Sequence, residues 1–110
     1  MVVQQLSDAE VDLIFHALAD ATRRDIIART IRREQSVSSL AAAYAMSFAA
    51  VQKHVAVLEK AALVSKVRRG REQIVRGNLD TIREAGVLLD QYEQLWRQRV
   101  KRMSDILSEG

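Results

Sequence analysis

The chain has 110 residues, of which 48% are hydrophobic and 28% charged, and it contains no cysteine. This length and balance are typical of one folded domain with a single core, so we place residues 1–110 in one domain. The lack of cysteine excludes disulfides, thiolate metal sites and thiol nucleophiles. No apolar run approaches the roughly 18 residues of a membrane span, and residues 1–5 carry no basic segment. We therefore expect a cytoplasmic protein without a membrane partner.

The net charge of +3 is distributed unevenly along the chain. Residues 1–22 contain four acidic and no basic residues, and residues 77–110 contain five basic and six acidic residues. Residues 23–76 contain twelve basic residues against four acidic ones. A basic middle segment favours a surface that binds a polyanion, although arginine-rich helices that are simply well solvated would give the same pattern. Charge alone leaves both interpretations open.

The first two predicted elements are helices. Ser7 and Glu10 have the spacing of a capping box, which predicts a helix over residues 8–18. Asp20 is placed to cap a second helix that ends near residues 34–36. The apolar stripe of that helix consists of Ile26, Ile27, Thr30 and Ile31.

Two shorter helices follow, and together they predict a helix-turn-helix over residues 38–60. We expect Ser38 to cap a helix that continues to Tyr44. After a turn of three or four residues, Ser47 is placed to cap a second helix that ends near Lys60.

The period of the pattern then changes from helix to strand. Residues 63–76 contain two β-branched stretches on either side of Arg69-Gly70-Arg71, which predicts a β-hairpin with a basic tip and a positive φ at Gly70. Helical spacing returns over residues 79–108. A helix of that length spans about 45 Å, more than a small domain can cover, so we expect a second copy of the chain to cover part of it.

The expected fold is mainly α with a small β-hairpin, in the order of a winged helix-turn-helix with long N- and C-terminal dimerisation helices. The local sequence also resembles the ArsR/SmtB family of repressors. The resemblance covers about residues 11–76 and departs from the family pattern at Ala21, where the family usually has proline, and at Ala62, where it usually has glycine. The matching segments are Leu18–Ile27, Val37–Ala41, Ser47–Leu58 and Glu59–Val64.

The resemblance implies that residues 47–60 form a recognition helix, whose N-terminal half enters the major groove of double-stranded DNA. The positions expected to face outward from the Ser47 cap are Phe48, Ala49, Gln52 and Lys53. Gln52 has the donor and acceptor needed to pair with adenine, and Lys53 can reach guanine or a phosphate. Phe48 and Ala49 can contact a thymine methyl group, with local packing as the alternative for Phe48.

Other basic residues are expected to contact DNA less specifically. Arg68, Arg69 and Arg71 surround the hairpin turn, where a wing contacts phosphates or the minor groove. Arg23 is interpreted either as a phosphate contact or as an intramolecular ion-pair partner, as is Arg24. For His54 we expect phosphate contact or helix packing, because the chain's only other histidine, His16, makes no chelating pair with it.

The chain lacks the ligands of the metal-sensing members of that family. Residues 37–41 contain no cysteine, and residues 79–108 contain no histidine beside Asp90 and Glu93. Because soft and borderline metals favour thiolate or imidazole ligands, we predict a member that senses no metal and holds no cofactor. The sequence also shows no phosphate-binding loop and no nucleophile beside a histidine, so we predict no enzymatic activity.

The sequence therefore predicts a homodimeric transcriptional regulator, most simply a repressor that binds an imperfect palindrome and that could regulate its own gene. The alternative is a winged-helix interaction module whose basic face binds an acidic protein. The sequence identifies no effector; a small apolar ligand, a protein partner and control by concentration all stay open. The residues predicted to form the dimer interface are Leu13, Ile14, Leu89, Tyr92, Trp96, Val100 and Met103.

Overall fold

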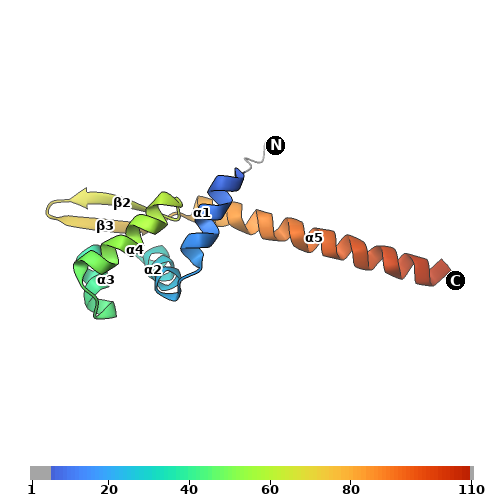
Figure 1. Cartoon of the computed structure of the whole chain (residues 1–110), viewed down its shortest axis with the longest axis horizontal. Helices are drawn as coiled ribbons and strands as arrows, with labels where there is room; N and C mark the ends of the chain where they lie inside the picture. Colours follow the sequence, from blue (N-terminus) through green and yellow to red (C-terminus); the bar gives the residue numbers. More distant parts are fainter. Residues whose placement is uncertain (1–5, 110) are drawn as a thin grey trace.

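The computed structural model describes residues 6–109, so residues 1–5 and Gly110 of the predicted single domain lie outside the described residues. Five helices and three short strands follow in the order α1-α2-β1-α3-α4-β2-β3-α5. Helices α1 to α4 and the sheet form a body, from which the hairpin of β2 and β3 and the long helix α5 extend in opposite directions (Figure 1). The longest dimension is 70 Å. The predicted class, mainly α with a small β-hairpin, is confirmed.

The first two helices start where the sequence predicts, because each has a capping residue directly before its first turn. Helix α1 (Asp8–Leu18) begins with the complete capping box of Ser7 and Glu10. Helix α2 (Ala21–Arg32) has Asp20 as its N-cap, and the Asp20 carboxylate accepts a hydrogen bond from the Arg23 amide at 3.0 Å. The α2 stripe is buried at three of its four predicted positions, while Ile31 is 48% exposed.

The start of helix α3 (Val37–Tyr44) differs from the prediction. The cap is Ser36, whose hydroxyl accepts from the Ser39 amide at 3.0 Å, and not Ser38. Starting the helix at Val37 buries Val37, Leu40 and Ala41, which lie on one helical face. Packing of that face decides between two serines that are equally able to act as caps.

Helix α4 (Phe48–Lys60) is capped by Ser47, as predicted, and it follows a turn formed by residues 45–47. Ala45 in that turn and Ala62 after α4 both have positive φ, of 54° and 58°. This left-handed conformation favours glycine, so the glycine that the family usually has at position 62 would fit the backbone adopted here.

The hairpin consists of β2 (Val64–Arg69) and β3 (Glu72–Gly77), and Gly70 has the predicted positive φ, of 64°. Arg69 pairs with Glu72 at the end of the ladder, so the turn is shorter than the predicted Arg69-Gly70-Arg71. A third strand was not predicted: β1 (Gln35–Ser36) pairs with β3 through Gln35 and Val75, giving the antiparallel order β1-β3-β2.

The core lies between the helices and the inner face of the sheet. The fully buried large side chains come from all four body helices, from β3 and from the segment before β2. They are Ile14, Ile26, Val37, Leu40, Val51, Val55, Leu58, Leu63 and Val75. Helix α5 (Leu79–Glu109) contributes buried residues only near its start, at Thr81 and Ala85.

Candidate nucleic-acid interface

Helix α4 has one buried and one exposed face. Val51, Val55 and Leu58 are 0% exposed and hold the helix against the core. The Ser47 hydroxyl accepts from the Ala50 amide at 3.1 Å and fixes the first turn. The opposite face presents exposed Phe48, Ala49 and Lys53 and half-buried Gln52. Phe48 is 46% exposed, so about half of this side chain is accessible to a ligand.

Gln52 does not stand free on that face. Its Nε2 donates to Oε1 of Gln73 on β3 at 2.8 Å, which connects the predicted recognition helix to the hairpin. One donor of the Gln52 amide is therefore already used within the chain. Its oxygen and its second N–H are the groups left for a ligand.

The arginines of the hairpin are held in different ways. Arg68 Nε donates to the Gly70 carbonyl at 3.3 Å and stays at the tip. Arg69 Nη1 lies 2.7 Å from Oε1 of Glu34, whose Oε2 lies 2.7 Å from Nε of Arg76. These hydrogen bonds hold the pKa of Glu34 below its usual value, with Arg69 as the larger cause. Arg71 is exposed and makes no ion pair with any residue in the described range 6–109.

Arg23 and Arg24 both donate hydrogen bonds to backbone carbonyls, a role that the sequence did not predict. Arg23 Nε donates to the Ala17 carbonyl at 2.8 Å and its Nη2 to the His16 carbonyl at 3.0 Å, while Arg24 Nη1 donates to the Leu18 carbonyl at 2.7 Å. Both arginines thus cap the C-terminal end of α1, whose last carbonyls lack helical partners. His54 is half-buried, and its Nδ1 lies 3.4 Å from Arg23 Nη1. This contact connects α4 to the start of α2, where Arg23 caps α1.

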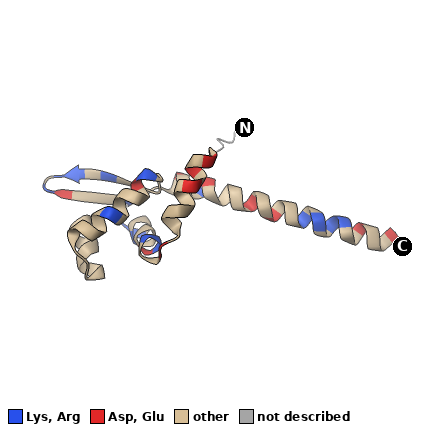
Figure 2. Ribbon diagram, viewed as in Figure 1, with Lys and Arg blue, Asp and Glu red and all other residues tan. Residues whose placement is uncertain are grey.

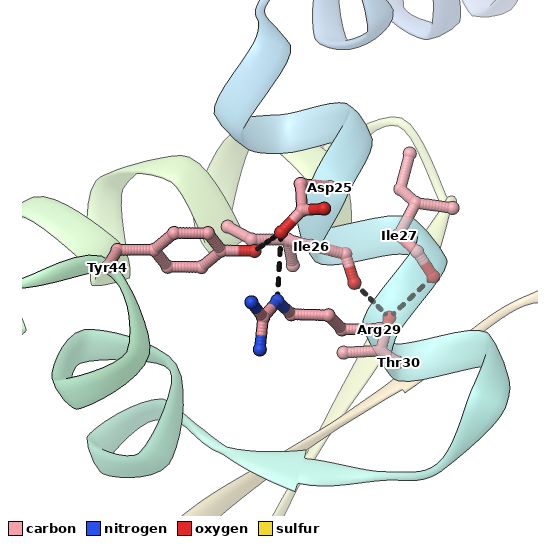
Figure 3. A network of polar contacts seen from close by, with 6 residues as sticks. All are labelled: Asp25, Ile26, Ile27, Arg29, Thr30 and Tyr44. Atoms are coloured by element: carbon pink, nitrogen blue, oxygen red, sulfur yellow. Dashed lines mark hydrogen bonds and ion pairs between the residues drawn. The ribbon is translucent and has the colours of Figure 1, made fainter.

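A polar network fixes α3 against α2 (Figure 3). The Tyr44 hydroxyl donates to Oδ2 of Asp25 at 2.5 Å, and Arg29 Nε donates to the same oxygen at 2.8 Å. The Arg29 guanidinium also lies over the Tyr44 ring, 5.1 Å from its centroid. Burial, together with the bond to Asp25, raises the pKa of Tyr44 to about 12. This network sets the position of α3, after which the chain turns into α4.

The residues predicted for the dimer interface lie in two different environments. Ile14 is 1% exposed in the core of its own subunit, because α1 packs on α2 and α4; it has no surface to offer a second copy. Leu13 is half-buried against the same core. The remaining five, Leu89, Tyr92, Trp96, Val100 and Met103, are exposed on α5 outside the body.

Two further kinds of site were searched for in the described residues. Among residues 6–109, no three His, Cys, Asp or Glu side chains are grouped so that they could hold a metal ion. Within the same range, no helix is both long and apolar enough to cross a membrane.

Sequence reasoning missed two residues that hold predicted DNA-binding side chains in place. Gln73 and Glu34 each contact a predicted DNA-binding residue, across 21 and 35 positions of the chain. No local signal marks either contact, because each depends on how the hairpin folds back onto α4 and onto the segment after α2. Only the charge of Glu34, directly after Arg32 and Arg33, hinted at a local partner for an arginine.

The arrangement of these elements is shared with known structures. An ArsR-like transcriptional regulator from Rhodococcus sp. RHA1 is 33% identical, with a TM-score of 0.78, over 89% of this chain and 92% of that one. Another ArsR family transcriptional regulator is 26% identical, with a TM-score of 0.78, over 86% of this chain and 97% of that one.

A more distant structure shares the fold alone. It is a homodimeric winged helix-turn-helix DNA-binding domain from Mycobacterium bovis, 23% identical with a TM-score of 0.65, over 86% of this chain and 92% of that one. No protein-family model and no curated protein sequence matches the chain. The first relative is similar enough, over nearly its whole length, to decide the assignment: the chain belongs to the ArsR family of winged helix-turn-helix transcriptional regulators.

Proposed function

We propose that this chain is a homodimeric repressor that binds double-stranded DNA at an imperfect palindrome. The observation that carries the proposal is the two-faced helix α4. Its core face is fully buried through Val51, Val55 and Leu58, and its outer face presents Phe48, Ala49, Gln52 and Lys53. A rigidly held helix with a polar and aromatic outer face suits base contact in the major groove.

The hairpin supplies the contacts that carry no sequence information. Arg68 and Arg71 lie at its tip, on the side of the body opposite α5 (Figures 1 and 2). In this role they contact phosphates or enter the minor groove beside the recognition helix. Arg23, His54 and Ser47 support the helix from within the chain, and any contact they make with phosphate is additional to the bonds they already form.

A homodimer is supported by the exposed apolar side of α5 and by the distant relative that is described as homodimeric. Two recognition helices related by a two-fold axis would bind half-sites one or more helical turns apart, which makes the operator palindromic. Occlusion of a promoter by such a dimer is repression, and no catalytic group is required for it.

Fluorescence anisotropy tests the proposal. The labelled duplex is the DNA upstream of this chain's own coding sequence, compared with a scrambled duplex of equal length at about 150 mM salt. We expect the native duplex to bind more tightly by about 10³-fold or more. Gln52→Ala should reduce that preference, whereas Arg71→Ala should weaken both duplexes equally and lower the salt slope by about one.

The alternative outcomes point elsewhere. Equal and steeply salt-dependent binding to both duplexes would place the operator at another locus or leave only general polyanion binding. Absence of binding to either duplex by a folded dimer would contradict the proposal and favour an acidic protein as the partner of the basic face.

A further inference from the structure

A small cavity lies where helix α1, the end of α4 and the start of α5 meet. Its volume is about 80 Å³. Glu10, Leu13 and Ile14 line it from α1, where they share one face because they are three and four positions apart. Thr81 and Glu84, also three positions apart, line it from α5. The cavity is therefore on the side of the body from which α5 extends, opposite the tip of the hairpin (Figure 1).

The buried part of the cavity wall is apolar. Leu6 and Leu13 are half-buried, Ile14 is 1% exposed and Ala61 is 5% exposed. An apolar cavity of about 150 Å³ holds one benzene molecule, so 80 Å³ encloses about half as many non-hydrogen atoms. This wall suits a short alkyl chain.

The polar part of the wall carries a carboxylate without a cationic partner in the described range. Glu84 is half-buried and makes no ion pair with any of residues 6–109. Glu10 lies on the opposite wall, but its Oε1 already accepts from the Ser7 amide at 2.9 Å. Lys60 also lines the cavity and pairs with neither carboxylate. Because two carboxylates face one ammonium group, the cavity favours a cation.

We propose that this cavity binds a short-chain primary alkylammonium ion. The ammonium group donates to the Glu84 carboxylate and to the Thr81 hydroxyl, one turn earlier on the same helix. The alkyl chain, of about three or four carbons, lies against Leu13 and Ile14. A neutral molecule of the same length leaves the Glu84 charge unpaired, and an anion is repelled by it.

The cavity is connected to helix α4 through Asn78. Asn78 Nδ2 donates to the Ala62 carbonyl at 3.0 Å, and Asn78 Oδ1 accepts from the Asp80 amide at 3.2 Å, in the first turn of α5. Ala62 itself lines the cavity, two residues after the end of α4. One side chain thus holds together the wall that follows α4 and the wall formed by α5. A ligand between these walls pushes them apart and shifts the end of α4.

The regulatory part of this inference rests on the proposed function, because α4 is the helix proposed to enter the major groove. A shift of its C-terminal end reorients the outer face that carries Gln52 and Lys53. We therefore expect the bound ammonium ion to lower the affinity for the operator. By linkage, operator DNA lowers the affinity for the ammonium ion by the same factor.

Nuclear magnetic resonance tests the site without DNA. The full-length chain, labelled with ¹⁵N, is titrated with n-butylammonium chloride and in parallel with n-butanol and with sodium butyrate, all at one ionic strength. We expect n-butylammonium to shift the amide signals of Leu13, Ala61 and Thr81, with a Kd on the order of 1 mM for so small a ligand. The neutral and the anionic probe should bind at least about tenfold more weakly.

Glu84→Gln removes the charge of the cavity while keeping the shape of the side chain. It should weaken n-butylammonium binding by about tenfold or more, because a hydrogen bond to a charged group is lost. Asp90→Asn is the matched control, since Asp90 is an exposed carboxylate on the same helix and outside the cavity. That variant should bind n-butylammonium as the wild type does. Circular dichroism establishes that both variants are folded.

Anisotropy with the operator duplex then tests the coupling. Saturating n-butylammonium chloride should weaken operator binding by about fivefold or more relative to sodium chloride of equal concentration. Glu84→Gln should bind the operator equally in both salts.

The possible failures separate the two proposals. If n-butylammonium shifts no signal at the cavity, if butyrate or butanol binds as tightly, or if Asp90→Asn loses as much affinity as Glu84→Gln, the ammonium site is overturned. Binding that depends on Glu84 but leaves the operator affinity unchanged overturns the coupling to α4. A chain that binds n-butylammonium at this cavity and binds no DNA contradicts the proposed function and leaves the ammonium site in place.

Discussion

The side-chain amide of Gln52 on the recognition helix is bonded to the side-chain amide of Gln73 on the wing, with 2.8 Å between Nε2 and Oε1. An amide that pairs with adenine must present its oxygen and one N–H in a fixed orientation. Gln73 accepts the other N–H of Gln52 and so restricts the rotation of that amide. In this structure the hairpin therefore positions a residue that is predicted to contact a base, in addition to carrying basic side chains.

Gln73→Leu removes that acceptor while leaving every charge in place. We expect the preference for the operator over a scrambled duplex to fall by roughly two- to twelvefold, since one hydrogen bond contributes about 0.5–1.5 kcal/mol. The salt slope should not change. Anisotropy titrations of Gln52→Ala, Gln73→Leu and the double variant measure the coupling. If the two substitutions are additive, Gln73 does not act through Gln52.

Glu34 holds two arginines of the sheet, Arg69 and Arg76, away from any other anion. Glu34→Gln should release both for phosphate contact, so we expect tighter binding to all duplexes and a salt slope that is steeper by about one. Glu72→Gln is the matched control, because Glu72 lies on the same wing and makes no ion pair within residues 6–109. Equal effects of the two substitutions would show that only the lost negative charge matters.

The Tyr44–Asp25 bond predicts a loss of stability at high pH. Burial raises the pKa of Tyr44 from 10.0 to about 12 in the folded chain. The folded state thus favours the protonated phenol, and this part of the stability is intact below the unfolded pKa of 10.0 and lost as the pH rises to about 12. The melting temperature of the wild type should exceed that of Tyr44→Phe at pH 8, and the difference should shrink at about pH 11.5.

Gly77 ends β3 directly against α2. A Cβ at this position would lie 2.6 Å from Cγ1 of Ile31 and 3.1 Å from its backbone nitrogen. Gly77→Ala should therefore lower the free energy of unfolding by about 1–3 kcal/mol. Gly86→Ala in α5 meets nothing within 4 Å and should raise it by about 0.5–1 kcal/mol. Urea unfolding at one protein concentration checks both; a stable Gly77→Ala would mean that α2 moves away without cost.

The parts of the fold that the sequence predicts correctly depend on neighbouring residues. Ser7, Asp20 and Ser47 each cap a helix through an amide three positions ahead, and Gly70 adopts its positive φ inside a two-residue turn. The choice of Ser36 over Ser38 depends on burial of Val37, and β1 exists only because β3 lies beside it. These features follow from tertiary packing, which no local pattern contains.

The candidate site also has one part that the sequence predicts and another that depends on the fold. Helical periodicity places Phe48, Ala49 and Lys53 on the outer face of α4, and the structure has them there. The partners of Gln52, Arg69 and Arg23 come from segments distant in the chain or from backbone carbonyls. A sequence lists the groups that can form hydrogen bonds, but only the fold determines which of them are already used.

The exposed outer half of α5 connects the lifetime of the chain to its assembly. In a subunit without a partner, this segment is a single solvated helix, which opens readily at its end. It contains Arg97, Arg99, Lys101 and Arg102, all preferred by proteases that cleave after basic residues. A cut after Arg97 or Arg99 would remove both Val100 and Met103 from the predicted dimer interface, and a cut after Lys101 or Arg102 would remove Met103. If the proposed homodimer covers this segment, we expect unassembled copies to be cleaved faster than assembled ones, which would leave mainly paired chains in the cell.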